Sequence, residues 1–499
     1  MSVLMINSNR FRPQVAPMGL EYVCNSLMRE KIEYKLIDFN FEPEKIVYNE
    51  LRRGDIELVG ITVRNVDTAF LAKSQWLLPH IKELVERIKN TRDCKVVLGG
   101  FGFSLFPREI LAYTGADMGV IGYGEEALPK IITTLRDNGD LSKIDNLIWL
   151  KNEKFHINNL SMGDYHNLPP RRRNIIRNLS YYRIYGLGNI ETLRGCVQHC
   201  GYCNVPNVVR NKVVTRNIDN LIAELIELKT MGINHVFFCD SEFNMAGNKF
   251  SFDLCEQIIK NKVGITWTAN LIPDSKMISQ DLLIRMKEAG CREILLSIDS
   301  GSEEILSSMD KRHNVEDAVI CSEYIRKANI NLIHTYLVGW PGESTRTINE
   351  TLSLIKRCQP QLSYLYSGIR IYPDTKIANI AKQEGLIPSN ANLLQPIFYQ
   401  PERVLQEFIP FLRHHTKDIP NCLVPTPLVN LMHLFNQNLY LGGGFSGGIV
   451  DAMHYMNSLP WLKKTRILGK TLLDILIPFK NRFIPIAESD NQVLESDSV

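Results

Sequence analysis

Three closely spaced cysteines are the residues of this sequence best suited to chemistry. Cys196, Cys200 and Cys203 follow a short apolar segment, residues 190–194, that is typical of a β-strand. Cysteine thiolates are the usual ligands of iron–sulfur clusters, and a cube of four irons with three protein ligands keeps one coordination position free. An open position on a metal is where a cofactor or substrate can bind. The spacing therefore predicts a [4Fe–4S] cluster whose fourth iron takes part in a reaction.

A zinc knuckle is the alternative, because short Cys-x-x-Cys spacings also bind zinc. A tetrahedral zinc site would need a fourth ligand. His199 lies between two of the cysteines, where it cannot easily complete a tetrahedron, and Cys239 follows only after a helix. The cluster is therefore the favoured interpretation.

The spacing Cys-x-x-x-Cys-x-x-Cys, with no fourth cysteine nearby, closely resembles the signature of the radical SAM enzymes. The resemblance implies that the free iron binds the amino and carboxylate groups of S-adenosylmethionine (SAM). One electron from the cluster would then cleave SAM to a 5′-deoxyadenosyl radical. The resemblance also implies Tyr202 as a SAM contact and an electron donor such as flavodoxin or ferredoxin as a partner.

Strands and amphipathic helices alternate from residue 190 onward. The strand candidates are residues 190–194, 235–239, 265–269, 293–298, 332–338 and 368–372. Six repeats predict a partial (β/α)6 barrel of the TIM type, whose active site is expected at the C-terminal ends of the strands. The cysteines follow the first strand, so we expect the cluster at that face.

Polar turns follow the later strands of this predicted barrel. Asp240 and Glu242 are acids placed to bond ribose hydroxyls. The turns at 299–301, 339–343 and 372–375 resemble the Glu-Ser-Gly, Gly-x-Pro-Gly-Glu and Tyr-Pro-Gly-Thr segments of radical SAM enzymes, with aspartate for glutamate in the first and for glycine in the last. The resemblance adds four candidate SAM contacts: Asp299, Ser300, Gly339 and Gly342.

The first 150 residues show the same alternation of strands and helices. Strand candidates are residues 3–6, 34–37, 58–63, 96–98 and 119–121, and a helix between them carries Ile81, Leu84, Val85 and Ile88 on one face. This pattern predicts a doubly wound, Rossmann-like parallel sheet. Ligands bind beyond the carboxyl ends of the strands in such sheets.

Glycine-rich loops at those strand ends resemble the cobalamin-binding domain that precedes the barrel in one subgroup of radical SAM enzymes. The resemblance implies that two loops approach the corrin and its nucleotide tail. The residues of these loops are Gly99 and Gly100 in the first, and Gly122, Gly124 and Glu125 in the second.

No protein histidine is expected below cobalt in this chain. The Asp-x-His-x-x-Gly pattern of other cobalamin domains is absent, and His80, the one histidine before residue 150, is expected at a solvated helix end. Arg64 and Asn65 are therefore the candidates for the lower face of cobalt. A pairing of Arg64 with Asp67 is the alternative.

Composition sets the frame for these motifs. The chain has 499 residues, a net charge of +3 and 11 cysteines. Such a charge does not suggest a nucleic-acid partner, and an odd number of scattered cysteines does not suggest a disulfide framework. With no signal peptide or membrane-spanning segment in the sequence, we expect a cytoplasmic protein in a reducing compartment.

Four regions are expected along the chain. They are a cobalamin-binding domain at 1–150, a linker at 151–185, a radical SAM barrel at 186–388 and a mostly helical C-terminal region at 389–499 with a disordered tail. The arginine run 171–173 is expected to be a solvated part of the linker, and a basic stretch at 463–482 is expected to pack on the barrel.

The two resemblances together imply a cobalamin-dependent radical SAM enzyme, and we expect a methyltransferase acting on an unactivated carbon of a small molecule or peptide. One SAM would methylate reduced cobalamin. The deoxyadenosyl radical from a second SAM would remove a hydrogen from the substrate, which would then take the methyl group from methylcobalamin. Two alternatives stay open: a cyclase, oxidase or rearrangement enzyme with the same cofactors, and a non-catalytic cobalamin or metal sensor.

Overall fold

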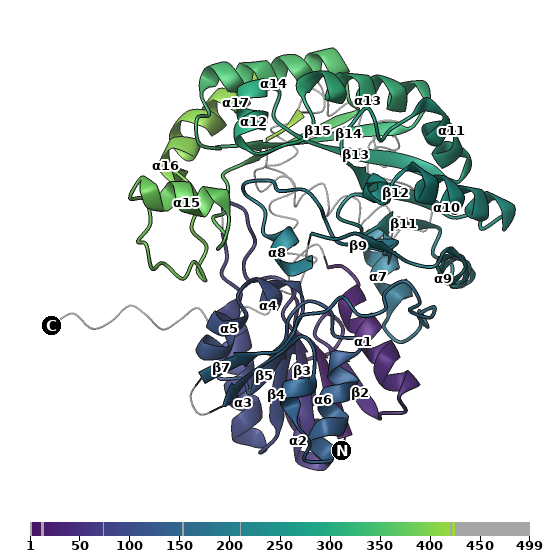
Figure 1. Ribbon diagram of the computed structural model, residues 1–499, viewed down its shortest axis with the longest axis vertical. Coiled ribbons are helices and arrows are strands. Elements are labelled where there is room, and N and C mark those ends of the chain that lie inside the picture. The colour runs from purple at the N-terminus through teal and green to yellow at the C-terminus, as the bar shows by residue number, and fades with distance from the viewer. Residues whose placement is uncertain are drawn as a thin grey trace, which may run out of the picture. The chain divides into compact units, whose positions relative to one another are not determined.

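The structure is a computed structural model that describes residues 2–10, 14–72, 74–151, 154–209, 211–419 and 422–424. Two seven-stranded sheets dominate these residues, one in the N-terminal part of the chain and one in the part that carries the cysteines (Figure 1). The predictions for the basic stretch 463–482 and for the C-terminal tail lie outside the described residues. The expected domain boundaries at 150, 185 and 388 stay predictions.

The first sheet is doubly wound, as predicted. Its strand order is β2-β1-β3-β4-β5-β6-β7, and β1 to β5 are parallel. The strands are β1 (Ser2–Asn7), β2 (Tyr34–Asp38), β3 (Ile56–Thr62), β4 (Lys95–Gly99), β5 (Met118–Val120), β6 (Leu147–Lys151) and β7 (Lys154–Ile157). The antiparallel hairpin of β6 and β7 was not predicted from the sequence.

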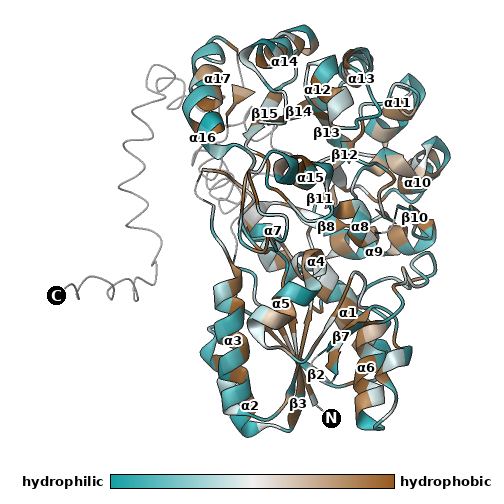
Figure 2. Cartoon of the chain, turned by 60° about the vertical axis from the view of Figure 1, so that its left-hand side comes forward, coloured by the Kyte–Doolittle hydropathy of each residue, from teal (hydrophilic) through white to brown (hydrophobic). Residues whose placement is uncertain are grey.

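Helices cover both faces of this sheet. They are α1 (Met18–Arg29), α2 (Lys45–Arg53), α3 (Leu78–Thr91), α4 (Phe101–Leu105), α5 (Pro107–Thr114) and α6 (Ala127–Arg136). Figure 2 shows α2 and α3 on one face and α1 and α6 on the other, with their apolar sides toward the strands. Apolar residues recur on α3 at the predicted positions, and all four are buried there. Burial of this stripe gives the helix its place on the sheet.

The second sheet is the predicted partial barrel, with seven parallel strands in the order β16-β15-β14-β13-β12-β11-β8. The strands are β8 (Gly188–Ile190), β11 (His235–Phe238), β12 (Thr266–Leu271), β13 (Cys291–Asp299), β14 (Asn331–Val338), β15 (Leu362–Ser367) and β16 (Cys422–Leu423). Figure 1 shows these strands as an arc with helices along its outer side.

Eleven α-helices are described in the second half of the chain. They are α7 (Asn178–Tyr185), α8 (Val205–Val209), α9 (Ile218–Thr230), α10 (Asn248–Lys260), α11 (Gln280–Glu288), α12 (Glu303–Ser308), α13 (Val315–Lys327), α14 (Thr345–Cys358), α15 (Lys376–Gln383), α16 (Pro401–Arg403) and α17 (Ile409–His415). A π-helical turn, Val404–Phe408, joins α16 to α17.

Two predicted barrel strands were placed wrongly. The strand expected at 190–194 ends at Ile190, and Leu193–Arg194 forms a separate strand, β9, that pairs antiparallel with β10 (Val214–Thr215). The chain turns between β8 and β9 because the carboxylate of Asp240 accepts hydrogen bonds from Thr192 and Leu193. The strand expected at 368–372 lies one segment earlier, as β15, which ends at Ser367 and is followed by Gly368 with a φ of 90°.

The prediction of a solvated arginine run at 171–173 was also wrong. The side chains of Arg171 and Arg173 are fully buried, and only Arg172 between them is exposed. Arg171 bonds Glu21 of α1 at 3.0 Å and Glu224 of α9 at 2.8 Å. Arg216 bonds the second oxygen of Glu224 at 2.8 Å. Arg173 also lies within 3.4 Å of both acids. A buried ionic cluster thus joins the helices of the first sheet to those of the barrel, and its members are Arg171, Arg173, Arg216, Glu21 and Glu224.

Removal of one acid from this ionic cluster should destabilise the protein strongly. Glu224→Gln leaves the buried guanidinium groups of Arg171 and Arg216 without their main counter-ion, which costs about 3–5 kcal/mol in comparable buried pairs. We expect the free energy of unfolding in urea to fall by that amount. Arg172→Ala, which removes the exposed neighbouring arginine, is the control and should change it by less than about 0.5 kcal/mol. Equal effects of the two variants would contradict this account.

Candidate cluster and cofactor site

The cysteine loop lies between β9 and α8 and is fixed by contacts to the far side of the barrel. The N–H of Gly201 donates to the carbonyl of Met309 at 2.8 Å, and the carbonyl of Gly201 accepts from the N–H of Ile377 at 3.0 Å. A Cβ on Gly201 would lie 2.7 Å from the indole ring of Trp340. The tryptophan of the predicted Gly-Trp-Pro-Gly-Glu turn therefore packs directly against the cysteine loop.

The three thiols of the loop are close enough to influence one another. Cys196 is buried beside Met245 and Ile272, and Cys200 and Cys203 are partly exposed. Burial raises the pKa of all three thiols, and the charges of Cys196 and Cys200 raise that of Cys203 further. Grouped thiols of this kind are the donor set of a cluster.

These donors fit a four-iron cluster better than a zinc ion. No three His, Cys, Asp or Glu side chains among the described residues surround a position for a single metal ion. A four-iron cluster gives each thiolate an iron of its own, so its ligands need not meet at one point. The arrangement thus disfavours the zinc alternative.

A buried chain of polar side chains lies beside Cys200. The ammonium group of Lys311 is 3.5 Å from the sulfur of Cys200 and 2.7 Å from Asp299. The hydroxyl of Tyr202 donates to the same carboxylate at 2.6 Å. Burial alone would lower the pKa of Lys311, but the charges of Asp299 and Cys200 outweigh it and hold that pKa above its usual value. A cation is thereby fixed next to one ligand of the cluster.

Lys311 was missed by the sequence analysis. Asp299 and Tyr202 were predicted as SAM contacts, and the structure shows them bound to each other and, through Asp299, to Lys311. Asp299 has a φ of 67°, which turns the chain at the end of β13. A single lysine after α12 carries no spacing signal, so only the fold brings it to the cysteine loop.

The two acids after β11 have different surroundings. Both oxygens of Asp240 are engaged by Thr192 and Leu193, at 2.6 to 3.1 Å, so this carboxylate holds the turn that leads into the cysteine loop. Glu242 has a buried Oε2 without a hydrogen-bond partner in the described part of the chain. Burial raises the pKa of each carboxyl to about 7. Of the pair, Glu242 is the one whose geometry leaves an oxygen for a ligand.

The remaining predicted SAM contacts shape turns. The hydroxyl of Ser300 accepts from the N–H of Ser302 at 3.2 Å and lies 3.4 Å from the hydroxyl of Thr351, so it faces α14. Gly339 and Gly342 have φ values of 110° and 89°, a region that glycine enters freely. These two glycines let the chain turn so that Trp340 lies under the cysteine loop.

A cavity of about 770 Å³ lies where the carboxyl ends of the first sheet meet β8, β9 and α8. We call it the glycine-lined cavity, because all four predicted loop glycines border it: Gly99, Gly100, Gly122 and Gly124. Gly100 has a φ of 103°, and a Cβ there would lie 2.8 Å from the carbonyl oxygen of Val63. The predicted cobalamin loops are thus brought together around one space.

Glu125 borders the same cavity, but its carboxylate is bound to a protein side chain. Its carboxylate accepts from the guanidinium of Arg194 at 2.5 Å, and the arginine is stacked on the rings of Tyr22, Tyr123 and Tyr165. Glu125 therefore connects the first sheet to β9, next to the cysteine loop. A direct cobalamin contact through this carboxylate stays a prediction.

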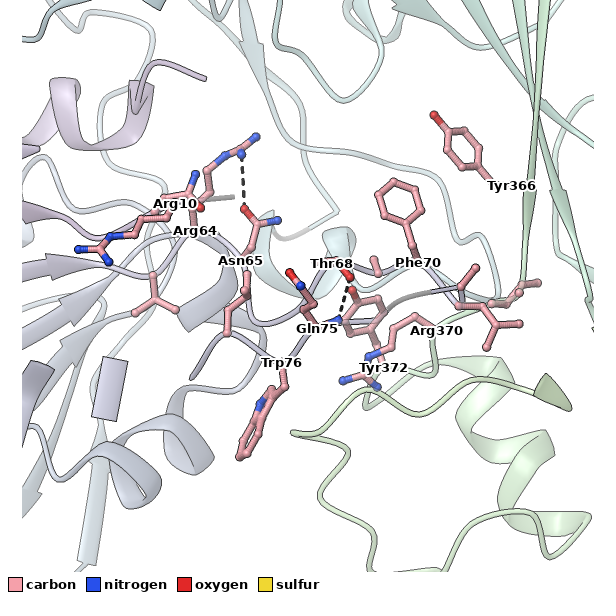
Figure 3. Close-up of a pocket in the computed structure, with 18 of the residues that line it drawn as sticks. Arg10, Arg64, Asn65, Thr68, Phe70, Gln75, Trp76, Tyr366, Arg370 and Tyr372 are labelled. Carbon is pink, nitrogen blue, oxygen red and sulfur yellow. Dashed lines mark hydrogen bonds between the residues drawn. The ribbon is translucent and has the colours of Figure 1, made fainter. Parts of the chain in front are cut away.

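A second cavity, of about 1020 Å³, adjoins the barrel mouth at the ends of β14 and β15 (Figure 3). We call it the aromatic cavity, because its wall includes Phe70, Trp76, Tyr202, Tyr366 and Tyr372. Tyr202 belongs to the cysteine loop, so this cavity reaches that loop. The part of the wall that comes from the first half of the chain consists of the segments after β1 and β3 and the start of α3.

Arg64 and Asn65 border both cavities. The guanidinium of Arg64 donates to the side-chain oxygen of Asn65 at 3.4 Å. Figure 3 marks this contact with a dashed line. Desolvation lowers the pKa of Arg64. The alternative pairing of Arg64 with Asp67 is excluded, because Asp67 is bound to Arg370 at 3.0 Å in a buried ion pair. The predicted lower-face residues thus stand between the two spaces.

Two family models match the chain over these two halves. Residues 6–132 match the B12 binding domain, and residues 190–355 match the radical SAM superfamily. The chain is a radical SAM protein with an N-terminal B12-binding domain. The predicted cofactors, a [4Fe–4S] cluster, SAM and cobalamin, are confirmed at the level of these two domains.

Similar proteins match this chain over most of its length. The chain is 22% identical over 466 residues to a tryptophan 2-C-methyltransferase of Streptomyces laurentii, a match that covers 78% of this chain and 77% of that one. It also resembles the solved structure of TsrM from Kitasatospora setae, with a TM-score of 0.80, 21% identity and coverage of 91% and 98%. The radical SAM enzyme OxsB gives a TM-score of 0.67 at 13% identity, with coverage of 93% and 75%. At these identities the solved structures show the fold alone.

Across the described residues, the structure contains no helix long and apolar enough to cross a membrane.

Each of the three loop cysteines should be needed for the cluster. Cys196→Ala, Cys200→Ala and Cys203→Ala each remove one of three iron ligands, so we expect iron and sulfide content after anaerobic reconstitution to fall several-fold. Cys94→Ala is the matched control, because Cys94 is also a buried free cysteine but lies at β4 in the other sheet. Loss of iron in the control to the same extent would contradict the assignment.

Gly100 should be needed for cobalamin binding. Gly100→Ala places a Cβ against Val63 and Thr62 in a left-handed backbone, which must distort the loop at the cavity wall. We expect cobalamin affinity to fall about tenfold or more in an equilibrium binding assay. Gly115→Ala is the control, because Gly115 also has a positive φ, of 71°, but a Cβ there meets nothing within 4 Å. Unchanged affinity in Gly100→Ala would remove this loop from the site.

Proposed function

We propose that the protein is a cobalamin-dependent radical SAM methyltransferase. The observation that carries the proposal is the position of Arg64 and Asn65. They border the glycine-lined cavity of the B12-binding domain and the aromatic cavity that reaches Tyr202 of the cysteine loop. A group held in the first cavity would therefore adjoin a molecule held in the second.

The chain's own residues supply binding and orientation. The three cysteines would hold the cluster, with Lys311 beside Cys200, and Glu242 offers a carboxylate oxygen toward SAM. Gly99, Gly100, Gly122 and Gly124 would give cobalamin a wall without side chains, and Arg64 and Asn65 would border it on the side of the aromatic cavity. When bound, the cluster and SAM supply radical chemistry, and cobalamin supplies methyl transfer. The protein fixes their positions and excludes water from the space between them.

The chemistry of Arg64 is compatible with a cobalamin that takes part in methyl transfer. A guanidinium cannot ligate a metal, because it has no free lone pair at neutral pH. A cobalamin held beside Arg64 would have no protein ligand from this residue, so none would have to dissociate when cobalt gave up a methyl group. The similarity to a tryptophan 2-C-methyltransferase supports the same reaction class, and its substrate makes L-tryptophan the first compound to test.

The proposal is tested by anaerobic reconstitution with iron, sulfide and cobalamin, followed by reduction in the presence of SAM. Either flavodoxin or ferredoxin serves as the electron donor. We expect bound cobalamin near one per chain and transfer of the labelled methyl group of SAM to protein-bound cobalamin, then to L-tryptophan or to a compound in a cell extract. Cys200→Ala is the control for dependence on the cluster.

Other results would identify the alternatives. SAM cleavage with cobalamin bound but no labelled product would favour a cyclase, oxidase or rearrangement enzyme. Bound cobalamin without any reaction of SAM would favour a sensor. Failure to bind cobalamin would contradict the proposal.

A further inference from the structure

A loop of the B12-binding domain reaches into the barrel mouth and ends in an exposed phenylalanine. The loop runs from Asp67 to Trp76, which form an antiparallel bridge at its base. Phe70 stands near its tip with 37% of its surface exposed. Its ring lies beside that of Tyr366 on β15, with centroids 6.2 Å apart and planes inclined by 23° (Figure 3). Two domains therefore each contribute one ring to the wall of the aromatic cavity.

The loop is held firmly although its tip is exposed. One oxygen of Asp67 accepts from the N–H of Ala69 at 2.7 Å, and the other is bound to Arg370 of the barrel. Leu71 lies on Gly368, where a Cβ would come within 2.7 Å of the leucine. Gly368 thus admits a residue of the other domain at the end of β15. The position of Phe70 is set by contacts on both sides of it.

The backbone before Phe70 is strained. Ala69 has a φ of 52°, a left-handed conformation that costs free energy for a residue with a side chain. A phenylalanine that only packed into the core would be buried, whereas this one is exposed to a cavity. Backbone strain that persists next to an exposed aromatic ring is typical of ligand-binding positions.

The ring of Tyr366 is supported on one side by the ring of Tyr364. The two rings are stacked, with centroids 5.9 Å apart and planes inclined by 21°. Tyr364 is buried, at 6% exposure, and the two residues point to the same side of β15 because they are two positions apart. The face of Tyr366 turned toward Phe70 is therefore the one available to a ligand.

We infer that Phe70 and Tyr366 form a clamp that binds a planar aromatic ring of the substrate between their faces. This inference rests on the proposed function, since it names the substrate class for the same site. Carbon atoms in contact are about 3.5–4.0 Å apart, so a ring between two others needs centroids about 7–8 Å apart. Because the loop itself is held, rotation of the exposed Phe70 side chain would have to widen the spacing of the two rings by about 1–2 Å. Ring stacking of this kind favours aromatic over saturated compounds.

The test compares two small acids that differ only in aromaticity, 3-phenylpropionate and 3-cyclohexylpropionate. Binding of each to the reconstituted holoenzyme is measured by ligand-observed NMR titration. We expect the aromatic acid to bind at least about fivefold more tightly than the saturated one. Equal affinity for both acids, or no binding of either, would overturn the clamp.

Substitutions assign the preference to the two rings. Phe70→Ala should weaken binding of 3-phenylpropionate about tenfold and abolish the preference, and Phe70→Tyr, which keeps a ring face, should retain it. Tyr366→Ala should act like Phe70→Ala. Leu150→Ala removes an exposed apolar side chain from β6, far from the cavity wall in the sequence, and should change nothing. Wild-type affinity in Phe70→Ala would overturn the clamp.

Cobalamin content and SAM cleavage are measured in the same samples to separate the two proposals. Normal values for both in Phe70→Ala, with loss of the aromatic preference, support the clamp. Normal values in the wild-type protein without any aromatic preference overturn the clamp and leave the methyltransferase proposal standing. Wild-type protein that binds no cobalamin contradicts the methyltransferase proposal, and the binding titration still decides whether the two rings recognise an aromatic group.

Discussion

The buried ionic cluster of Arg171, Arg173, Arg216, Glu21 and Glu224 is the constraint on which the site depends. It joins α1 of the first sheet to α9 of the barrel through the segment between them. Both cavities are bordered by residues from each side of this junction. A change in the junction would therefore alter the spacing between cobalamin loops and cysteine loop, even though none of the five residues belongs to the candidate cluster site.

Buried charges are a costly way to hold two layers together, since desolvation of each ion opposes folding. The advantage of buried charges is that their hydrogen bonds are directional. Several hydrogen bonds to one carboxylate fix orientation as well as distance: two guanidinium N–H groups of Arg171 donate to Oε2 of Glu224, and the backbone N–H of Arg171 donates to Oε1. Apolar packing tolerates sliding, because it is not directional. An enzyme that must hold two large cofactors next to each other benefits from the directional contact. The Arg194–Glu125 pair, enclosed by tyrosine rings, extends the same principle to the strand before the cysteines.

Local patterns predicted much of this structure. The cysteine spacing, the apolar runs of both sheets and the glycine loops at their ends each follow from a few neighbouring residues, and the fold places them as expected. Contacts between distant residues were the part that could not be predicted. The run 171–173 has the composition of a solvated linker, and its burial depends on acids about 50 and 150 positions away. Lys311 contacts Cys200, and Phe70 contacts Tyr366. In both pairs the partner is distant in the sequence, so neither contact could be predicted from local pattern.

The two acids after β11 have different hydrogen-bond partners, and their positions in the sequence could not reveal this difference. Asp240 and Glu242 both follow β11, and both were predicted to bond ribose hydroxyls. Hydrogen bonding separates them, because Thr192 and Leu193 occupy the oxygens of Asp240 whereas one oxygen of Glu242 is left without a partner in the described part of the chain. Asp240 therefore holds the turn that leads into the cysteine loop, whereas Glu242 keeps an oxygen available to a ligand. The same division recurs across the site, because Glu125, Asp299 and Ser300 are also engaged by protein groups.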